Sequence, residues 1–320
     1  MDSTNLFQWA TKELSQDAFI CWLLSFALKE NKGKNPALEA CALDLIHKIP
    51  NLETAQEVSR IEKQVYGIDV LLTVGDCYVI IEDKVFGDTY EGQIYNYKQN
   101  LAKYENVDPE KILCVLYKIT EQAQPEQDVD YEFNRAKLLQ IMCPYKTTCN
   151  SDVFTYYVEH LEYLEYLAQF DKHPISEWNS EAYKKFFSHL KKEKILPQDR
   201  IWFRVNNPSG GFWGFAWDFC DDIDPSKTIF NSVYLQIEDN VVAVKIDADP
   251  QEDFDAQRIK EARWEIFDYF YSRVLVFQKK VFRPGNYMTV GYVEYNEKNY
   301  VEKITTMQKV FDDMKKELRL

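Results

Sequence analysis

A tight turn between two strand-like segments is the feature that most restricts how this chain can fold. Val58 to Val74 and Cys77 to Phe86 have the two-residue period of strands, and Gly75-Asp76 between them is typical of a hairpin turn. A turn at this place fixes the register. Val74 then faces Cys77 and, further along the two strands, Asp69 faces Glu82 on the same side of the sheet.

Two opposed carboxylates on one sheet face repel each other unless a cation or a shared proton lies between them. Asp69 and Glu82 therefore form half of a site for a hard cation with oxygen ligands, the type that Mg²⁺ prefers. Lys84 follows on the same strand face, where it can orient a water molecule and stabilise negative charge on a phosphate. Asp83 points to the other face, but its backbone carbonyl can still reach the metal. From these residues alone, a surface cluster of salt bridges is the alternative.

The order of these residues along the chain resembles the PD-(D/E)XK nuclease superfamily. An opening helix is followed by Asp69, by Glu82-Asp83-Lys84 and by a helix in which Gln93 precedes Tyr97 by four positions. More narrowly, the chain resembles a bacterial branch that begins with an acidic residue and an aromatic-rich helix, here Glu13 to Leu24. Ile68 stands where the superfamily's name has a proline.

The resemblance spans residues 6 to 120 and implies a Mg²⁺-dependent nuclease, with Mn²⁺ as a substitute ion. It implies that Asp69, Glu82 and the backbone carbonyl of Asp83 hold the metal and that Lys84 serves the attacking water. Glu13 completes the metal shell, with Asp17 as the other candidate for this role. Gln93 and Tyr97 share one helix face, which the resemblance places beside the metal to contact phosphate or sugar. The alternative is that Tyr97 packs in the core while Gln93 is solvated.

The rest of the pattern predicts a mixed α/β protein of two domains, 1–172 and 173–320. The first is expected to be a restriction-endonuclease-like α-β-β-(β)-α-β core with a mixed sheet flanked by helices, and the second an accessory α+β domain. Helices are expected at 15–33, 36–49, 91–104, 153–170, 180–194, 250–275 and 298–318, and further strands at 111–119, 201–205, 211–219, 229–238, 241–246 and 287–295.

Lysines gather on the helix expected at 180–194. Such a run is commonly a solvated helix face, but in a chain otherwise poor in basic patches it is also the expected phosphate contact. We therefore name Lys184, Lys185, Lys191 and Lys192 as candidate substrate-binding residues. The strand from Gly210 to Trp217 alternates small and aromatic residues, and its rings are expected to fill a core or to stack on bases.

Composition limits the function further. A net charge of −14 argues against an indiscriminate nucleic-acid coat, and the seven scattered cysteines, odd in number, favour a reducing cytoplasm. The longest apolar run, Ala18 to Leu28, is too short to span a membrane. The expected partner is nucleic acid, with DNA favoured, while the second domain is a place for a protein partner or a second copy of the chain. The alternative to an enzyme is a catalytically silent nuclease fold that only binds.

Overall fold

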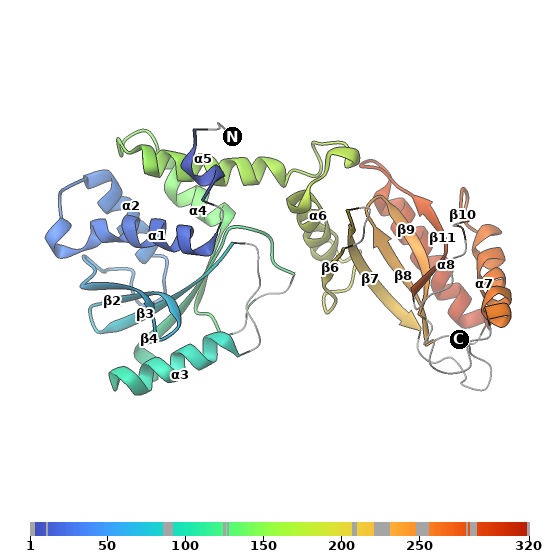
Figure 1. Ribbon diagram of the computed structural model, residues 1–320, viewed down its shortest axis with the longest axis horizontal. Helices are drawn as coiled ribbons and strands as arrows, with labels where there is room; N and C mark the ends of the chain where they lie inside the picture. Colours follow the sequence, from blue (N-terminus) through green and yellow to red (C-terminus); the bar gives the residue numbers. More distant parts are fainter. Residues whose placement is uncertain are drawn as a thin grey trace. The chain divides into compact units, whose positions relative to one another are not determined.

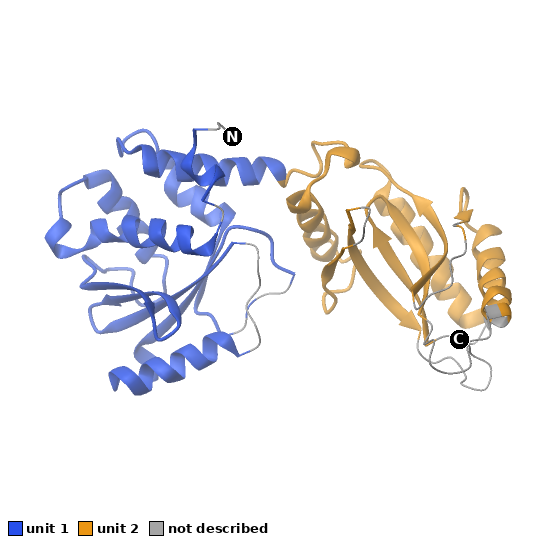
Figure 2. Cartoon of the chain, viewed as in Figure 1, with its two compact units in different colours: residues 1–167 blue, residues 168–320 orange. Residues whose placement is uncertain are grey.

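The computed structural model describes residues 4–10, 12–85, 92–123, 126, 128–206, 210–220, 231–247, 256–279, 281 and 287–318. The chain divides into two compact units, residues 1–167 and 168–320, which Figure 2 shows in different colours. The division falls close to the boundary expected after residue 172. Each unit has its own sheet.

Unit 1 is built on a mixed sheet of five strands in the order β1-β2-β3-β4-β5. β1, β2 and β3 are antiparallel neighbours, whereas β4 runs parallel to both β3 and β5. The strands are β1 (Arg60–Val65), β2 (Ile68–Val74), β3 (Cys77–Lys84), β4 (Ile112–Lys118) and β5 (Tyr131–Asn134). The expected central strand within 111–119 is confirmed as β4, which is buried along its whole length.

Helices cover both faces of this sheet, as Figure 1 shows. One face carries α3 (Gln93–Glu105), and the other carries α1 (Glu13–Leu24), α2 (Pro36–Ile46), α4 (Arg135–Met142) and α5 (Asp152–Leu167). Single 3₁₀ turns lie at Leu6–Gln8, Ser25–Ala27, Lys29–Asn31, Pro109–Lys111 and Cys143–Tyr145. Unit 1 is thus a mixed α/β layer structure, as expected.

Several predicted elements differ from the structure. The segment 58–74 is not one strand but two, because Tyr66 and Gly67 adopt left-handed backbone conformations that turn the chain between β1 and β2. The first helix, expected at 15–33, begins earlier, at Glu13 after Lys12, and ends at Leu24. The elements β5 and α4 were not expected, and the predicted ends at residues 86 and 91 lie outside the described residues.

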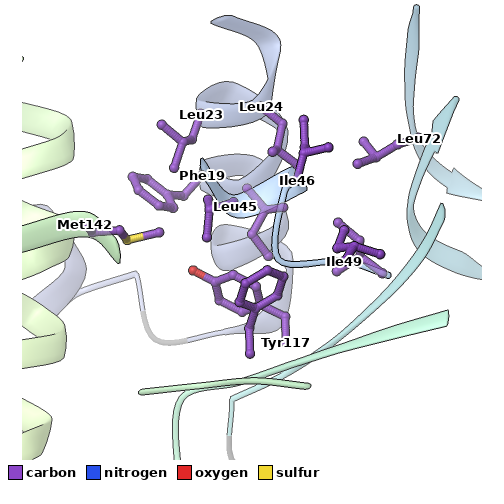
Figure 3. A pocket seen from close by; sticks show the side chains of 12 residues that line it. Phe19, Leu23, Leu24, Leu45, Ile46, Ile49, Leu72, Tyr117 and Met142 are labelled. Atoms are coloured by element: carbon purple, nitrogen blue, oxygen red, sulfur yellow. The ribbon is translucent and has the colours of Figure 1, made fainter. Parts of the chain in front are cut away.

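The larger core lies between the sheet and the four-helix layer. Its side chains leave a small apolar gap of about 20 Å³, lined by Phe19 of α1, Met142 of α4, Tyr117 of β4 and others (Figure 3). A gap of this size holds about one water molecule, and an apolar one stays dry. We therefore treat it as a packing defect of the core rather than as a ligand site.

Unit 2 is an α+β body with an antiparallel sheet in the order β10-β11-β9-β8-β7-β6. Its strands are β6 (Trp202–Val205), β7 (Phe212–Cys220), β8 (Ser232–Glu238), β9 (Val241–Asp247), β10 (Gln278–Lys279) and β11 (Tyr287–Glu294). Its helices are α6 (Ser180–Lys192), α7 (Ala256–Tyr271) and α8 (Tyr300–Leu318), after a 3₁₀ turn at Ile175–Glu177. Short β10 was not expected, and residues 229–230 and 250–255 of the predicted elements lie outside the described residues.

Among the residues that the structure describes, no helix combines the length and the apolar character needed to cross a membrane.

Candidate active site

The predicted register of the β2–β3 hairpin is confirmed. Val70 pairs with Ile81, and the ladder continues in the same register to the turn. One step beyond that pair, Asp69 and Glu82 lie close enough for the charge of Asp69 to raise the pKa of Glu82. Asp69 Oδ2 also accepts a hydrogen bond of 3.0 Å from the backbone N–H of Asp83. The hairpin therefore brings the two predicted carboxylates together at the end of β3.

Glu82 is the most constrained of these groups. Its residue is 1% exposed, and its Oε1 accepts from Lys84 Nζ at 2.7 Å and from Gln93 Nε2 at 2.5 Å. Burial raises the pKa of Glu82 to about 7; the charge of Asp69 adds to this, while the hydrogen bond from Lys84 opposes it. At neutral pH this carboxyl is therefore balanced between its protonated and its charged form.

The pKa of Lys84 is also set by opposing effects, and here the charged form is favoured. Burial lowers the pKa of its amine, but the hydrogen bond to Glu82 and the charges of Glu82, Glu13 and Asp69 outweigh burial, and the net shift is upward. Lys84 is thus a stable ammonium group that donates hydrogen bonds and does not act as a base. Glu13, half-buried at the start of α1, lies near enough for its charge to act on this lysine.

A second pair of carboxylates lies between α1 and the sheet. Asp17 and Asp83 are both fully buried, and burial is the largest cause that raises the pKa of each. Gln16 Nε2 donates to Asp83 Oδ1. Gln64, in a left-handed backbone conformation, donates from Nε2 to Asp17 Oδ2 and to Asp69 Oδ1, at 3.1 Å each. Asp69 is therefore the link between the two pairs.

Glutamine amides thus donate to all four carboxylates, but they do not satisfy every oxygen. Within the described part of the chain, Asp17 Oδ1, Glu82 Oε2 and Asp83 Oδ2 are buried and have no hydrogen-bond partner. A buried carboxylate oxygen without a donor is costly. The pKa values of Asp17, Asp83 and Glu82 are all raised, so these oxygens call either for a proton shared between neighbouring carboxyls or for a cation. The described residues nevertheless contain no group of three acidic, histidine or cysteine side chains already spaced to hold a metal ion.

A chain of hydrogen bonds connects this cluster to the interior. Tyr157 OH, on α5, donates to Gln16 Oε1 at 3.2 Å, and Tyr117 OH, on β4, lies 3.0 Å from Tyr157 OH. Gln16 in turn holds Asp83. Sequence reasoning did not identify Gln16, Tyr157 or Tyr117. Tyr157 is far from the motif in sequence and looks like an ordinary core tyrosine, so no local pattern signals this role.

The shared face of Gln93 and Tyr97 is confirmed, because Gln93 Nε2 lies 2.9 Å from Tyr97 OH. Gln93 is buried against Glu82 rather than solvated. The expected contact of these two residues with phosphate or sugar stays a prediction.

Lys118 is a further residue that the sequence analysis missed. It ends β4, and the parallel ladder pairs it with Lys84, so both lysines lie on the sheet face that carries Glu82. Lys118 is 1% exposed. A lysine closing an otherwise apolar central strand was the available signal, since such a position is seldom charged without a reason.

The lysine-rich helix does not offer the continuous basic face that was expected. Lys184 is buried beside Glu181 at 3.4 Å, and Lys191 is buried with its Nζ donating to Arg200 O at 2.8 Å. Lys185 is half-buried and Lys192 is exposed. A phosphate contact from this helix therefore rests on Lys185 and Lys192, and it stays a prediction.

Comparisons with protein families, with curated proteins and with solved structures found no match to this chain.

Proposed function

We propose that this protein is a Mg²⁺-dependent phosphodiesterase that hydrolyses nucleic acid, with DNA as the expected substrate, in the cytoplasm. The observation that carries the proposal is the cluster of buried carboxylates with unpartnered oxygens beside the ammonium group of Lys84. The mixed sheet with helices on both faces is compatible with the proposed restriction-endonuclease-like core. All seven cysteines are free thiols, which is compatible with a reducing compartment.

The donor atoms at the site fit a hard divalent cation by type and charge. They are carboxylate oxygens, with no sulfur or imidazole among those named above, which suits Mg²⁺ or Mn²⁺. Asp69 and Glu82 would hold the ion. We propose Asp17 as the third carboxylate, because its charge acts on the Asp69 side of the cluster. The charge of Glu13, by contrast, acts on Lys84.

When bound, the ion would supply positive charge that activates water and neutralises the leaving oxygen. The remaining work falls to the side chains. Lys84, kept protonated by Glu82, donates to the attacking water or to a non-bridging phosphate oxygen and stabilises the charge that develops there. Gln93 fixes the Glu82 carboxylate by its hydrogen bond. Water attacks phosphorus as the P–O bond to the leaving oxygen breaks; the attacking water gives one proton to solvent, and the leaving oxygen takes one from solvent.

The test is cleavage of linear and circular DNA by purified protein with Mg²⁺, with Mn²⁺ or with a chelator. We expect metal-dependent cleavage by the wild type and its loss in Asp69→Asn and Lys84→Gln, with both variants still folded by circular dichroism. Asp76→Asn is the matched control, because Asp76 lies in the exposed turn of the same hairpin. Equal cleavage by wild type and both site variants would show that the activity comes from a contaminant.

The second candidate is a nuclease fold that binds without cleaving. It is favoured by one observation, that no three metal-binding side chains among the described residues already have the spacing to hold an ion. A protein that binds DNA equally well with and without metal, and never cleaves it, would establish this alternative.

A further inference from the structure

Unit 2 contains a hollow of about 590 Å³ that is separate from the carboxylate cluster. Three aromatic side chains line it, Trp178, Tyr183 and Trp213, together with the oppositely charged Arg204 and Asp239. Small-molecule sites typically have volumes of roughly 300–1,000 Å³, with aromatic walls and a few polar groups. The hollow therefore has the size and the lining of a ligand site.

Trp213 is less buried than Phe215 and Trp217 of the same strand. Phe215 and Trp217 are buried, which confirms the expectation that rings of this strand fill a core. Trp213, by contrast, is only half-buried. Its indole Nε1 donates to Ser180 Oγ at 3.2 Å, and the guanidinium carbon of exposed Arg204 lies 5.5 Å from its ring centroid. A fixed ring beside an exposed cation is suited to a nucleobase and its phosphate.

Asp239 supplies the third element. It lies between β8 and β9 in a left-handed backbone conformation, with φ +47°. Its carboxyl accepts a hydrogen bond from the backbone of Trp213, and its own N–H donates to Trp213 O at 3.3 Å. The carboxylate is therefore fixed next to the indole wall. A carboxylate only accepts hydrogen bonds, and among the nucleobases guanine presents two adjacent N–H donors on its pairing edge.

We propose that this hollow binds an unpaired guanine nucleotide. The base lies against Trp213 with its donor edge toward Asp239, and its phosphate lies toward Arg204. This inference deepens the proposed function and rests on it for the source of the nucleotide, an unpaired stretch of the nucleic-acid substrate. Free guanosine monophosphate has the same chemistry, so the experiment must include both sources.

The experiment measures binding in a chelating buffer, so that cleavage plays no part. The probes are a short labelled oligothymidine with one central guanine, the same strand with adenine instead, and free guanosine and adenosine monophosphates. We expect the guanine probes to bind about tenfold tighter or more, the discrimination typical of a bidentate contact. Arg204→Gln should weaken binding of every probe. Asp239→Asn should remove the preference for guanine, and asparagine tolerates the left-handed backbone.

Arg273→Gln is the matched control, because Arg273 is an exposed arginine of unit 2 that pairs with Glu317 and does not line the hollow. The proposal is overturned if guanine and adenine probes bind equally, or if the guanine preference survives in Asp239→Asn. Guanine preference in the free nucleotides alone would keep the site and reject the strand as its source. The binding assay contains no metal and so does not depend on cleavage. If the guanine preference is observed but the protein never cleaves DNA, the proposed nuclease activity is refuted and the guanine site stands.

Discussion

Replacing Glu82 by glutamine tests the buried carboxylate directly, because a shifted pKa is a pH-dependent contribution to stability. Burial raises the pKa of Glu82 from an ordinary 4.5 to about 7 in the folded protein. Between these two pH values the folded chain binds more protons than the unfolded chain. Without metal, the free energy of unfolding of unit 1 should therefore fall as the pH rises through this window.

The size of the effect follows from the shift. Each pKa unit corresponds to about 1.36 kcal/mol, so the charged form of Glu82 costs roughly 3 kcal/mol of stability. This cost is absent below the unfolded pKa and complete above the folded one. For a unit of this size, about 2–4 °C of melting temperature corresponds to 1 kcal/mol, so we expect a difference of roughly 6–12 °C.

The assay is thermal unfolding of wild type and Glu82→Gln from pH 4.5 to pH 8.5 in a chelating buffer. The variant should gain melting temperature relative to wild type as the pH rises, whatever constant offset the lost ion pair with Lys84 introduces. Asp76→Asn, in the exposed turn, should follow wild type at every pH. A difference between Glu82→Gln and wild type that does not change with pH would refute the buried-carboxylate description.

Three further outcomes are expected. Mg²⁺ or Mn²⁺ at ten times its Kd should stabilise wild type by about 1.4 kcal/mol, seen as a rise in melting temperature, and Asp69→Asn should melt higher than wild type without metal and respond little to the ion. Gln16→Leu, which leaves Asp83 without its donor, should lower the free energy of unfolding in urea by about 1–3 kcal/mol. Lys192→Glu should weaken DNA binding and flatten its salt dependence. Lys191→Ala should mainly lower the melting temperature, because Lys191 is buried. Equal effects of the two variants on the salt dependence of binding would contradict this assignment.

The hairpin at the centre of the site could be predicted because its signals are local. Gly75-Asp76 sets the turn, the turn sets the register, and the register places Asp69 at Glu82. The apolar run of β4 was equally clear, because a strand covered on both faces needs no alternation.

The other half of the site could not be predicted because it depends on contacts distant in sequence. Asp17 looks like a residue of the first helical turn that favours the helix dipole, yet it is fully buried against the sheet. Gln64 lies in a segment that sequence analysis assigned to a single long strand, so its left-handed conformation was hidden. Lys184 was expected to bind substrate, yet it is buried. The sequence shows that a helix carries several lysines, but it does not show which of them the rest of the fold will cover.

The hydrogen-bond chain from Tyr117 through Tyr157 and Gln16 to Asp83 makes these four positions inseparable for protein engineering. Tyr157→Phe keeps the shape of the interior but removes the hydrogen bond that Gln16 accepts from Tyr157. Gln16 is then less firmly held, and the position of the Asp83 carboxyl that it contacts changes with it. In a library that randomises these positions together, functional clones should carry matched combinations rather than independent substitutions. Directed evolution of this site would then have to begin in the interior of unit 1.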